Sequence, residues 1–65
     1  MTPEEAEQKY LEVEQYLDSG LENQVITPVE EIQLLVKLGD LWWLLSDEAQ
    51  LRAENRTRDW LKAHP

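Results

Sequence analysis

The chain has 65 residues, no cysteine and a formal net charge of −8, from 14 acidic and 6 basic residues. The lack of cysteine excludes a disulfide scaffold and a thiolate metal site. The acidity argues against nucleic-acid binding, because phosphates would meet a surface of like charge. With 42% apolar residues and three tryptophans, the chain is too hydrophobic for intrinsic disorder. We therefore predict one small folded domain that spans residues 1–65.

The N-terminus is acidic and does not resemble a targeting segment. Residues 1–5 read Met-Thr-Pro-Glu-Glu, and no apolar stretch approaches the roughly 20 residues needed to span a bilayer. We therefore expect a cytoplasmic protein without a membrane partner. A chain this short buries little core, so good helix packing or self-association must supply its stability.

Two segments open with the same helix-start pattern, Thr-Pro-x-Glu, at residues 2–5 and 27–30. In this pattern threonine caps the helix, proline occupies the first helical position and glutamate closes a capping box. The first start predicts a helix over about residues 3–19, after which Gly20 is suited to the left-handed conformation that ends a helix. The second start predicts a helix over about residues 28–45.

The third predicted helix follows a break at residues 46–50, Ser-Asp-Glu-Ala-Gln, with Asp47 as its N-cap. It runs over about residues 47–63. Three helices of similar length with short connections predict an all-α, up-down-up three-helix bundle. If the break were absent, residues 28–63 would form one long helix beside a short first helix, and an obligate dimer would be needed to bury it.

The second helix is apolar on almost all sides, which indicates burial in several directions. Residues 41–45 read Leu-Trp-Trp-Leu-Leu, and Trp42 and Trp43 point about 100° apart around the helix. Leu44 lies on the otherwise polar line of this helix. We expect Trp42, Trp43 and Leu44 to form an interface patch, most simply covered in a symmetric homodimer. The alternative is that both indole rings lie in the core with their edges at the surface.

Negative charge is concentrated at the N-terminal end. Residues 1–22 carry seven acidic residues and one lysine, whereas residues 47–65 are neutral. One line of the first helix consists of Glu7, Leu11, Glu14 and Asp18. We predict that this line faces solvent without basic neighbours, attracts a basic surface of a partner protein and uses Leu11 as an apolar anchor. The alternative is a face that only keeps the protein soluble.

Residues suited to catalysis or metal binding are scarce. The single imidazole, His64, lies next to the C-terminus, where the backbone is usually frayed. Thr2 and Thr27 serve as caps, and the glutamates at the helix starts complement the helix dipoles. We expect neither an enzyme nor a cofactor or metal site.

These patterns favour a small acidic protein that binds another protein, as a regulator, inhibitor or assembly adaptor. The second helix would supply the apolar contact and the first helix the acidic steering. One alternative is a nucleic-acid mimic that blocks a DNA- or RNA-binding protein, since Glu14 and Asp18 stand about 6 Å apart along the helix axis, close to a phosphate step. Another is a purely structural subunit of a homodimer.

Overall fold

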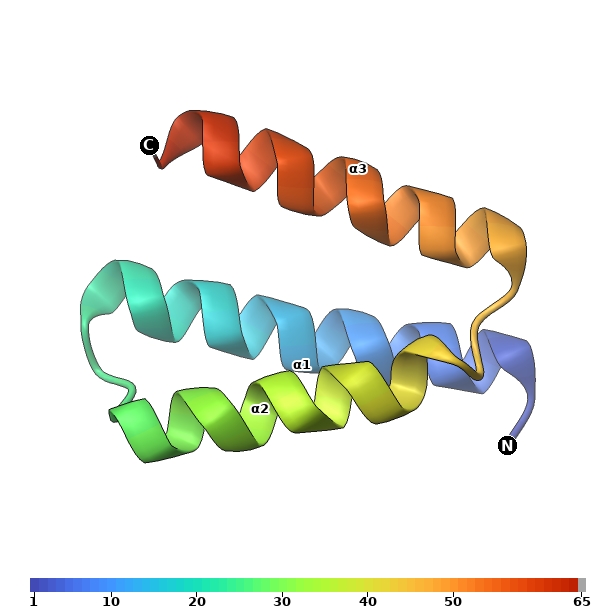
Figure 1. Ribbon diagram of the computed structural model, residues 1–65, viewed down its shortest axis with the longest axis horizontal. Helices are drawn as coiled ribbons and strands as arrows, with labels where there is room; N and C mark the ends of the chain where they lie inside the picture. The colour runs from blue at the N-terminus through green and yellow to red at the C-terminus, as the bar shows by residue number, and fades with distance from the viewer. Residues whose placement is uncertain (65) are drawn as a thin grey trace.

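The computed structural model describes residues 1–64, which form three helices: α1 (Pro3–Asn23), α2 (Pro28–Trp42) and α3 (Asp47–Ala63). The helices run up, down and up, with α1 and α3 pointing the same way and α2 antiparallel to both (Figure 1). No strand occurs among these residues. The predicted all-α three-helix architecture is confirmed. The alternative of one long second helix is wrong, because α2 and α3 are separate helices joined by a short loop.

The first two helices begin at threonine side chains, as the Thr-Pro-x-Glu pattern predicts. Thr2 Oγ1 accepts a hydrogen bond from the backbone N–H of Glu5 at 3.2 Å. Thr27 Oγ1 accepts one from the N–H of Glu30 at 3.2 Å, and the Glu30 carboxylate accepts the N–H of Thr27 in return, which completes a capping box. Two backbone donors at the start of α2 are thereby satisfied.

The third helix spans the predicted residues, but its N-cap lies one residue before the predicted one. Ser46 has the extended backbone of an N-cap, and its Oγ accepts a hydrogen bond from the N–H of Ala49 at 3.2 Å. Asp47, predicted as the cap, lies instead in the first turn of α3, where its negative charge complements the free N–H groups. α2 also ends earlier than predicted, because residues 43–45 form a turn between the two helices.

α1 ends four residues later than predicted. Gly20 is helical and buried, and the chain leaves the helix at Gln24, which adopts the left-handed conformation with φ 58°. The N–H of Gln24 donates to the carbonyls of Gly20 and Leu21. The side chain of Ile26 occupies the space in which a β-carbon on residue 20 would stand. Close packing across the α1–α2 connection, and not a left-handed backbone, therefore requires glycine at this position.

Substituting Gly20 by Ala is expected to lower the free energy of unfolding by about 1–2 kcal/mol, although alanine is the better helix former by about 1 kcal/mol. The added methyl group overlaps the side chain of Ile26, whose branched β-carbon leaves few alternative rotamers. Urea denaturation followed by tryptophan fluorescence measures the change. In an Ile26→Ala background the same substitution should stabilise the protein, and equal effects in both backgrounds would contradict the contact.

The core is small and asymmetric. α1, α2 and the turn after α2 supply its larger side chains, including Tyr10, Leu41 and Leu45, whereas α3 contributes Ala49 and Ala53. α3 runs alongside α1 and moves away from α2 toward its own C-terminal end (Figure 1). No large side chain within residues 1–64 is fully enclosed. This packing covers only part of the apolar surface of α2.

Candidate partner-binding surface

The outer face of α2 carries a row of apolar positions at helical spacing. We call Val29, Ile32, Val36, Gly39 and Trp43 the α2 stripe; intervals of three and four residues place all five on one face. The exposed fractions are 63% for Val29, 62% for Ile32, 59% for Val36 and 81% for Trp43. Trp43 extends the row past the end of α2, because its backbone keeps right-handed φ and ψ angles of −73° and −11°. The row is about 21 Å long.

The α2 stripe stays open because the other two helices lie elsewhere around α2. The opposite face of α2 packs on the core through Leu34, Leu38 and Leu41. α3 runs beside α1 (Figure 1), and Gln50 of α3 donates a hydrogen bond to the backbone carbonyl of Trp42 at the end of α2. A helix that is apolar on almost all sides, with neighbours on only two of them, leaves the remaining apolar face in contact with water.

The two flanks of the α2 stripe differ in chemistry. One flank carries Gln33, Lys37 and Asp40, all exposed and on successive turns. The other flank is apolar and carries Leu35 and Trp42, which border the space between α2 and α3. The two glutamates in the first turn of α2 lie on the opposite half of the helix. The stripe therefore has one polar edge, with a single positive and a single negative charge, and one apolar edge.

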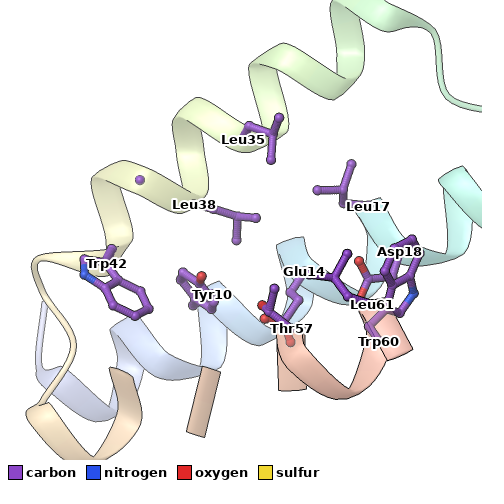
Figure 2. A pocket seen from close by; sticks show the side chains of 11 residues that line it. Tyr10, Glu14, Leu17, Asp18, Leu35, Leu38, Trp42, Thr57, Trp60 and Leu61 are labelled. Atoms are coloured by element: carbon purple, nitrogen blue, oxygen red, sulfur yellow. The ribbon is translucent and has the colours of Figure 1, made fainter. Parts of the chain in front are cut away.

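A cleft of about 350 Å³ lies between the three helices on the apolar edge of the stripe (Figure 2). Leucine and aromatic side chains line most of it, among them Leu38 and Leu61. The ring of Trp42 forms one wall and packs on Tyr10, with 6.0 Å between the ring centroids. The cleft exists because α3 moves away from α2 toward the C-terminal end of α3 (Figure 1). The same separation leaves the α2 stripe without a neighbouring helix.

Asp18 lies in the lining of this cleft and is half-buried (Figure 2). Burial, and to a smaller extent the negative charge of Glu14, raises the pKa of the Asp18 carboxyl above its ordinary value. A carboxyl with a raised pKa binds its proton more tightly in the folded state than in the unfolded state. The ionised form of Asp18 therefore destabilises the fold.

Asp18→Asn is expected to stabilise the protein at pH 7 by on the order of a few tenths of a kcal/mol, because water still screens this half-exposed charge. The gain should vanish once the pH falls below the unfolded-state pKa of about 3.9, where wild-type Asp18 is protonated in both states. Thermal unfolding of both proteins at pH 7 and pH 3 measures this difference. An equal gain at the two pH values would show that ionisation of Asp18 is not its cause.

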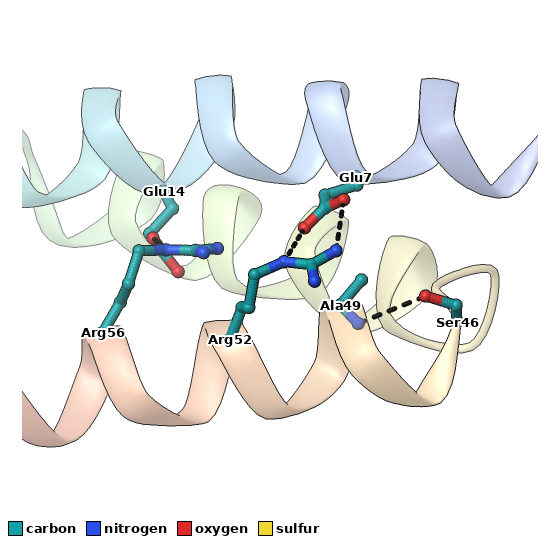
Figure 3. Close-up of polar contacts among 6 residues, drawn as sticks. All are labelled: Glu7, Glu14, Ser46, Ala49, Arg52 and Arg56. Carbon is teal, nitrogen blue, oxygen red and sulfur yellow. Dashed lines mark hydrogen bonds and ion pairs between the residues drawn. The ribbon is translucent and has the colours of Figure 1, made fainter.

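Two arginines of α3 bind the acidic line of α1 (Figure 3). Arg52 donates two hydrogen bonds to the Glu7 carboxylate at 2.8 and 2.9 Å, and Arg56 donates one to Glu14 at 2.6 Å. Glu14 is only 8% exposed. The hydrogen bonds from Arg52 lower the pKa of the Glu7 carboxyl. The prediction that this line faces solvent without basic neighbours is wrong, because the line packs against α3.

The inward-facing side of α3 explains why the acidic line of α1 has basic neighbours. Ala49 and Ala53 are buried in the core cluster that includes Ala6 and Tyr10 of α1, and Arg56 lies on the same side of α3 one turn later. A charge at such a position needs a partner on the facing helix, which Glu14 provides. Leu11, predicted as an outward anchor, is half-buried on the same line of α1. The acidic line of α1 and the apolar face of α2 are therefore two separate surfaces.

The structure divides the predicted aromatic patch. Trp43 is exposed on the α2 stripe, and Leu44 is 49% exposed in the turn that follows α2. Trp42 is half-buried against Tyr10 on the cleft side and belongs to another face. The valine and isoleucine side chains that accompany Trp43 on the stripe are absent from the predicted site. Their spacing of three and four residues, continued through Gly39 to Trp43, is the sequence signal that identifies them.

Within residues 1–64, no three His, Asp or Glu side chains converge as a metal-binding group, and no helix is long and apolar enough to cross a bilayer. His64 stacks on Trp60, with 4.1 Å between the ring centroids. Comparisons of the chain with protein-family models, with curated proteins and with solved structures find no match. The surface described above is therefore the basis for inferring function.

Proposed function

We propose that this protein is a non-enzymatic protein–protein interaction module whose contact surface is the α2 stripe. The observation that supports the proposal is the continuous exposure of Val29, Ile32, Val36 and Trp43 on one helix face. Contiguous exposed apolar patches on small soluble proteins mark interaction sites, and tryptophan is enriched among the residues that dominate binding energy.

The energetics of burial favour this surface over the acidic one. An aliphatic side chain gains about 1.5–3 kcal/mol when it passes from full exposure to full burial, and a tryptophan buries about 150–250 Å². Trp43, at 81% exposed, retains most of its area for a partner. Glu7 and Glu14, by contrast, already bind arginines of α3, so acidic steering through this line no longer supports the proposal.

Nucleic-acid mimicry is not proposed for the same reason. It depended on Glu14 and Asp18 as a pair of free carboxylates at phosphate spacing. Glu14 is buried and bound to Arg56. Asp18 lies in the cleft lining with a pKa that is raised above its ordinary value.

The test compares wild type with two variants that each introduce one glutamate. Val36→Glu places it at the centre of the α2 stripe, and Leu51→Glu places it on the outward side of α3, where Leu51 is 56% exposed. Neither substitution buries the new charge, so both variants should keep a helical circular dichroism spectrum. A binding partner retained by immobilised wild type and by Leu51→Glu, whether a second copy of this chain or another protein of the cell extract, should be lost from Val36→Glu. Equal retention by all three would contradict the proposal.

A further inference from the structure

We propose that the occupant of the α2 stripe is the α2 stripe of a second copy of this chain, paired antiparallel about a twofold axis that passes between residues 37 and 38. This inference rests on the proposed function, because it names the partner of the same surface. Four features of the described chain support it: the register of the stripe, the bare backbone at its centre, the charges on its polar flank and the distribution of acidic residues over the three helices.

The register of the stripe allows it to pair with itself. Its intervals of three, four, three and four residues form the a and d positions of a heptad pattern, which lies along the seam of two packed helices. With the axis between residues 37 and 38, Trp43 packs on Ile32 of the second copy, and Val36 packs on Gly39 of the second copy. The twofold axis repeats both contacts, so the largest exposed side chain of the stripe is covered twice per dimer.

Gly39 is the position at which the second copy can approach most closely. A β-carbon built on Gly39 would meet no atom within 4 Å, so the packing of this chain itself gives no reason for glycine there. Glycine in the interior of a helix is unfavourable compared with alanine. The missing side chain leaves the backbone of α2 bare at the centre of the stripe. In the proposed register Val36 of the second copy lies over this gap.

The charges on the polar flank distinguish an antiparallel from a parallel dimer. An antiparallel twofold axis places equivalent flanks side by side, so Lys37 faces Asp40 of the second copy, offset by about 3 Å along the helix axis. A parallel pair would instead place the flank that carries these two charges against the flank of Leu35 and Trp42. Only the antiparallel dimer pairs opposite charges and keeps the apolar edges together.

The acidic excess of the chain does not oppose this dimer. Most of the negative charge lies on α1, which packs on the opposite side of α2 from the stripe. In the dimer the two α1 helices are separated by three helix spacings, roughly 25–30 Å. This is well beyond the Debye length of about 8 Å at physiological ionic strength. Pairing through α2 therefore brings together two helices of net charge −2 each and holds apart the two α1 helices, of net charge −6 each.

The first experiment measures the mass of the protein in solution over a thousandfold range of concentration by analytical ultracentrifugation. Wild type and the Leu51→Glu control should form a dimer that dissociates on dilution, and Val36→Glu should raise the dissociation constant at least a hundredfold. A wild-type monomer throughout would overturn the inference. If the protein were monomeric but still captured another protein through Val36, the proposed function would hold and the dimer would be wrong. A dimer unaffected by Val36→Glu would overturn the inference, and the capture experiment would then decide the proposed function separately.

A charge exchange tests the register. Lys37→Glu and Asp40→Lys should each raise the dissociation constant about tenfold, because each converts two attractive contacts per dimer into repulsive ones. The double variant restores opposite charges and should return the dissociation constant to within about threefold of wild type. A double variant as weak as the single ones would show that these side chains do not face each other.

The absence of cysteine in the chain permits a direct measurement of the pairing. Val36→Cys and Gly39→Cys chains, mixed and treated with the thiol oxidant diamide, should form the mixed disulfide in excess over both homodimers. A disulfide requires α-carbons within about 4.4–6.8 Å, which the proposed register provides for residues 36 and 39. Asn55→Cys, on the outward side of α3, is the control and should remain reduced. Predominant linkage of residue 36 to residue 36 would overturn the antiparallel register.

Discussion

Replacing Ala53 with Leu is expected to lower the free energy of unfolding by about 2–3 kcal/mol. Ala53 is 1% exposed, and it lies in a seam of small residues with Ala6 at 0% and Ala49 at 2%, where α1 and α3 approach each other. The larger side chain has no space between α1 and α3, and the open cleft that Ala53 borders lies on the side of Trp42 and Leu61. We therefore expect α3 to move away from α1, which would lengthen the arginine contacts to Glu7 and Glu14.

Urea denaturation followed by tryptophan fluorescence measures this loss. A domain of this size has only about 3–5 kcal/mol of stability from its core, so the Ala53→Leu protein should be partly unfolded without denaturant. Asn55→Leu adds a leucine to the exposed side of the same helix and is the matched control, with little expected change. An Ala53→Leu protein as stable as wild type would show that α3 is not held to α1 by this seam.

Replacing Arg56 with Met is expected to lower the free energy of unfolding by about 2–3 kcal/mol. The substitution keeps the length of the side chain but removes the donor that binds the Glu14 carboxylate at 2.6 Å. Because Glu14 is 8% exposed, its charge would remain largely out of water without a partner. An unpaired buried charge is far less favourable than the same charge in a salt bridge.

A double-mutant cycle separates the ion pair from the loss of packing. In Glu14→Gln/Arg56→Met the uncompensated charge is gone, so most of the lost stability should return. Arg52→Met is the matched comparison, since the Arg52–Glu7 pair lies at the surface and screening by water weakens it. Equal destabilisation by Arg52→Met and Arg56→Met would contradict the claim that burial of Glu14 makes its arginine important.

Helix starts were predictable because the interactions that define them lie within four residues. Thr2 and Thr27 accept the predicted hydrogen bonds, and the cap of the third helix is displaced only from Asp47 to Ser46. Serine and aspartate are both good caps, and the choice between two adjacent candidates depends on which of them has an extended backbone. Short-range chemistry locates a helix start to within a residue here.

Helix ends and side-chain pairs were harder to predict because they depend on distant residues. Glycine is the residue type that most often ends a helix, yet Gly20 lies inside α1, where the side chain of Ile26 packs against it. Glu7 and Glu14 form an apparently free acidic line until α3 brings Arg52 and Arg56 against it, 45 and 42 residues further along the chain. An arginine on the inward stripe of α3 is the sequence signal for such a partner.

Three helices in an up-down-up order, with the position of each cap to within one residue, were predictable because capping, periodicity and loop length are local properties. The apolar residues on almost all sides of the second helix also predict burial in several directions, which the other two helices do not supply by themselves. Which sides of α2 are covered depends instead on how the other two helices pack, and so on contacts between residues far apart in the chain. The near-uniform apolar surface of α2 gives no internal preference, and α3 lies beside α1 (Figure 1), with Ala49 and Ala53 buried in the same cluster as Ala6. That choice covers Glu7 and Glu14 and leaves Val29, Ile32, Val36 and Trp43 open to a partner.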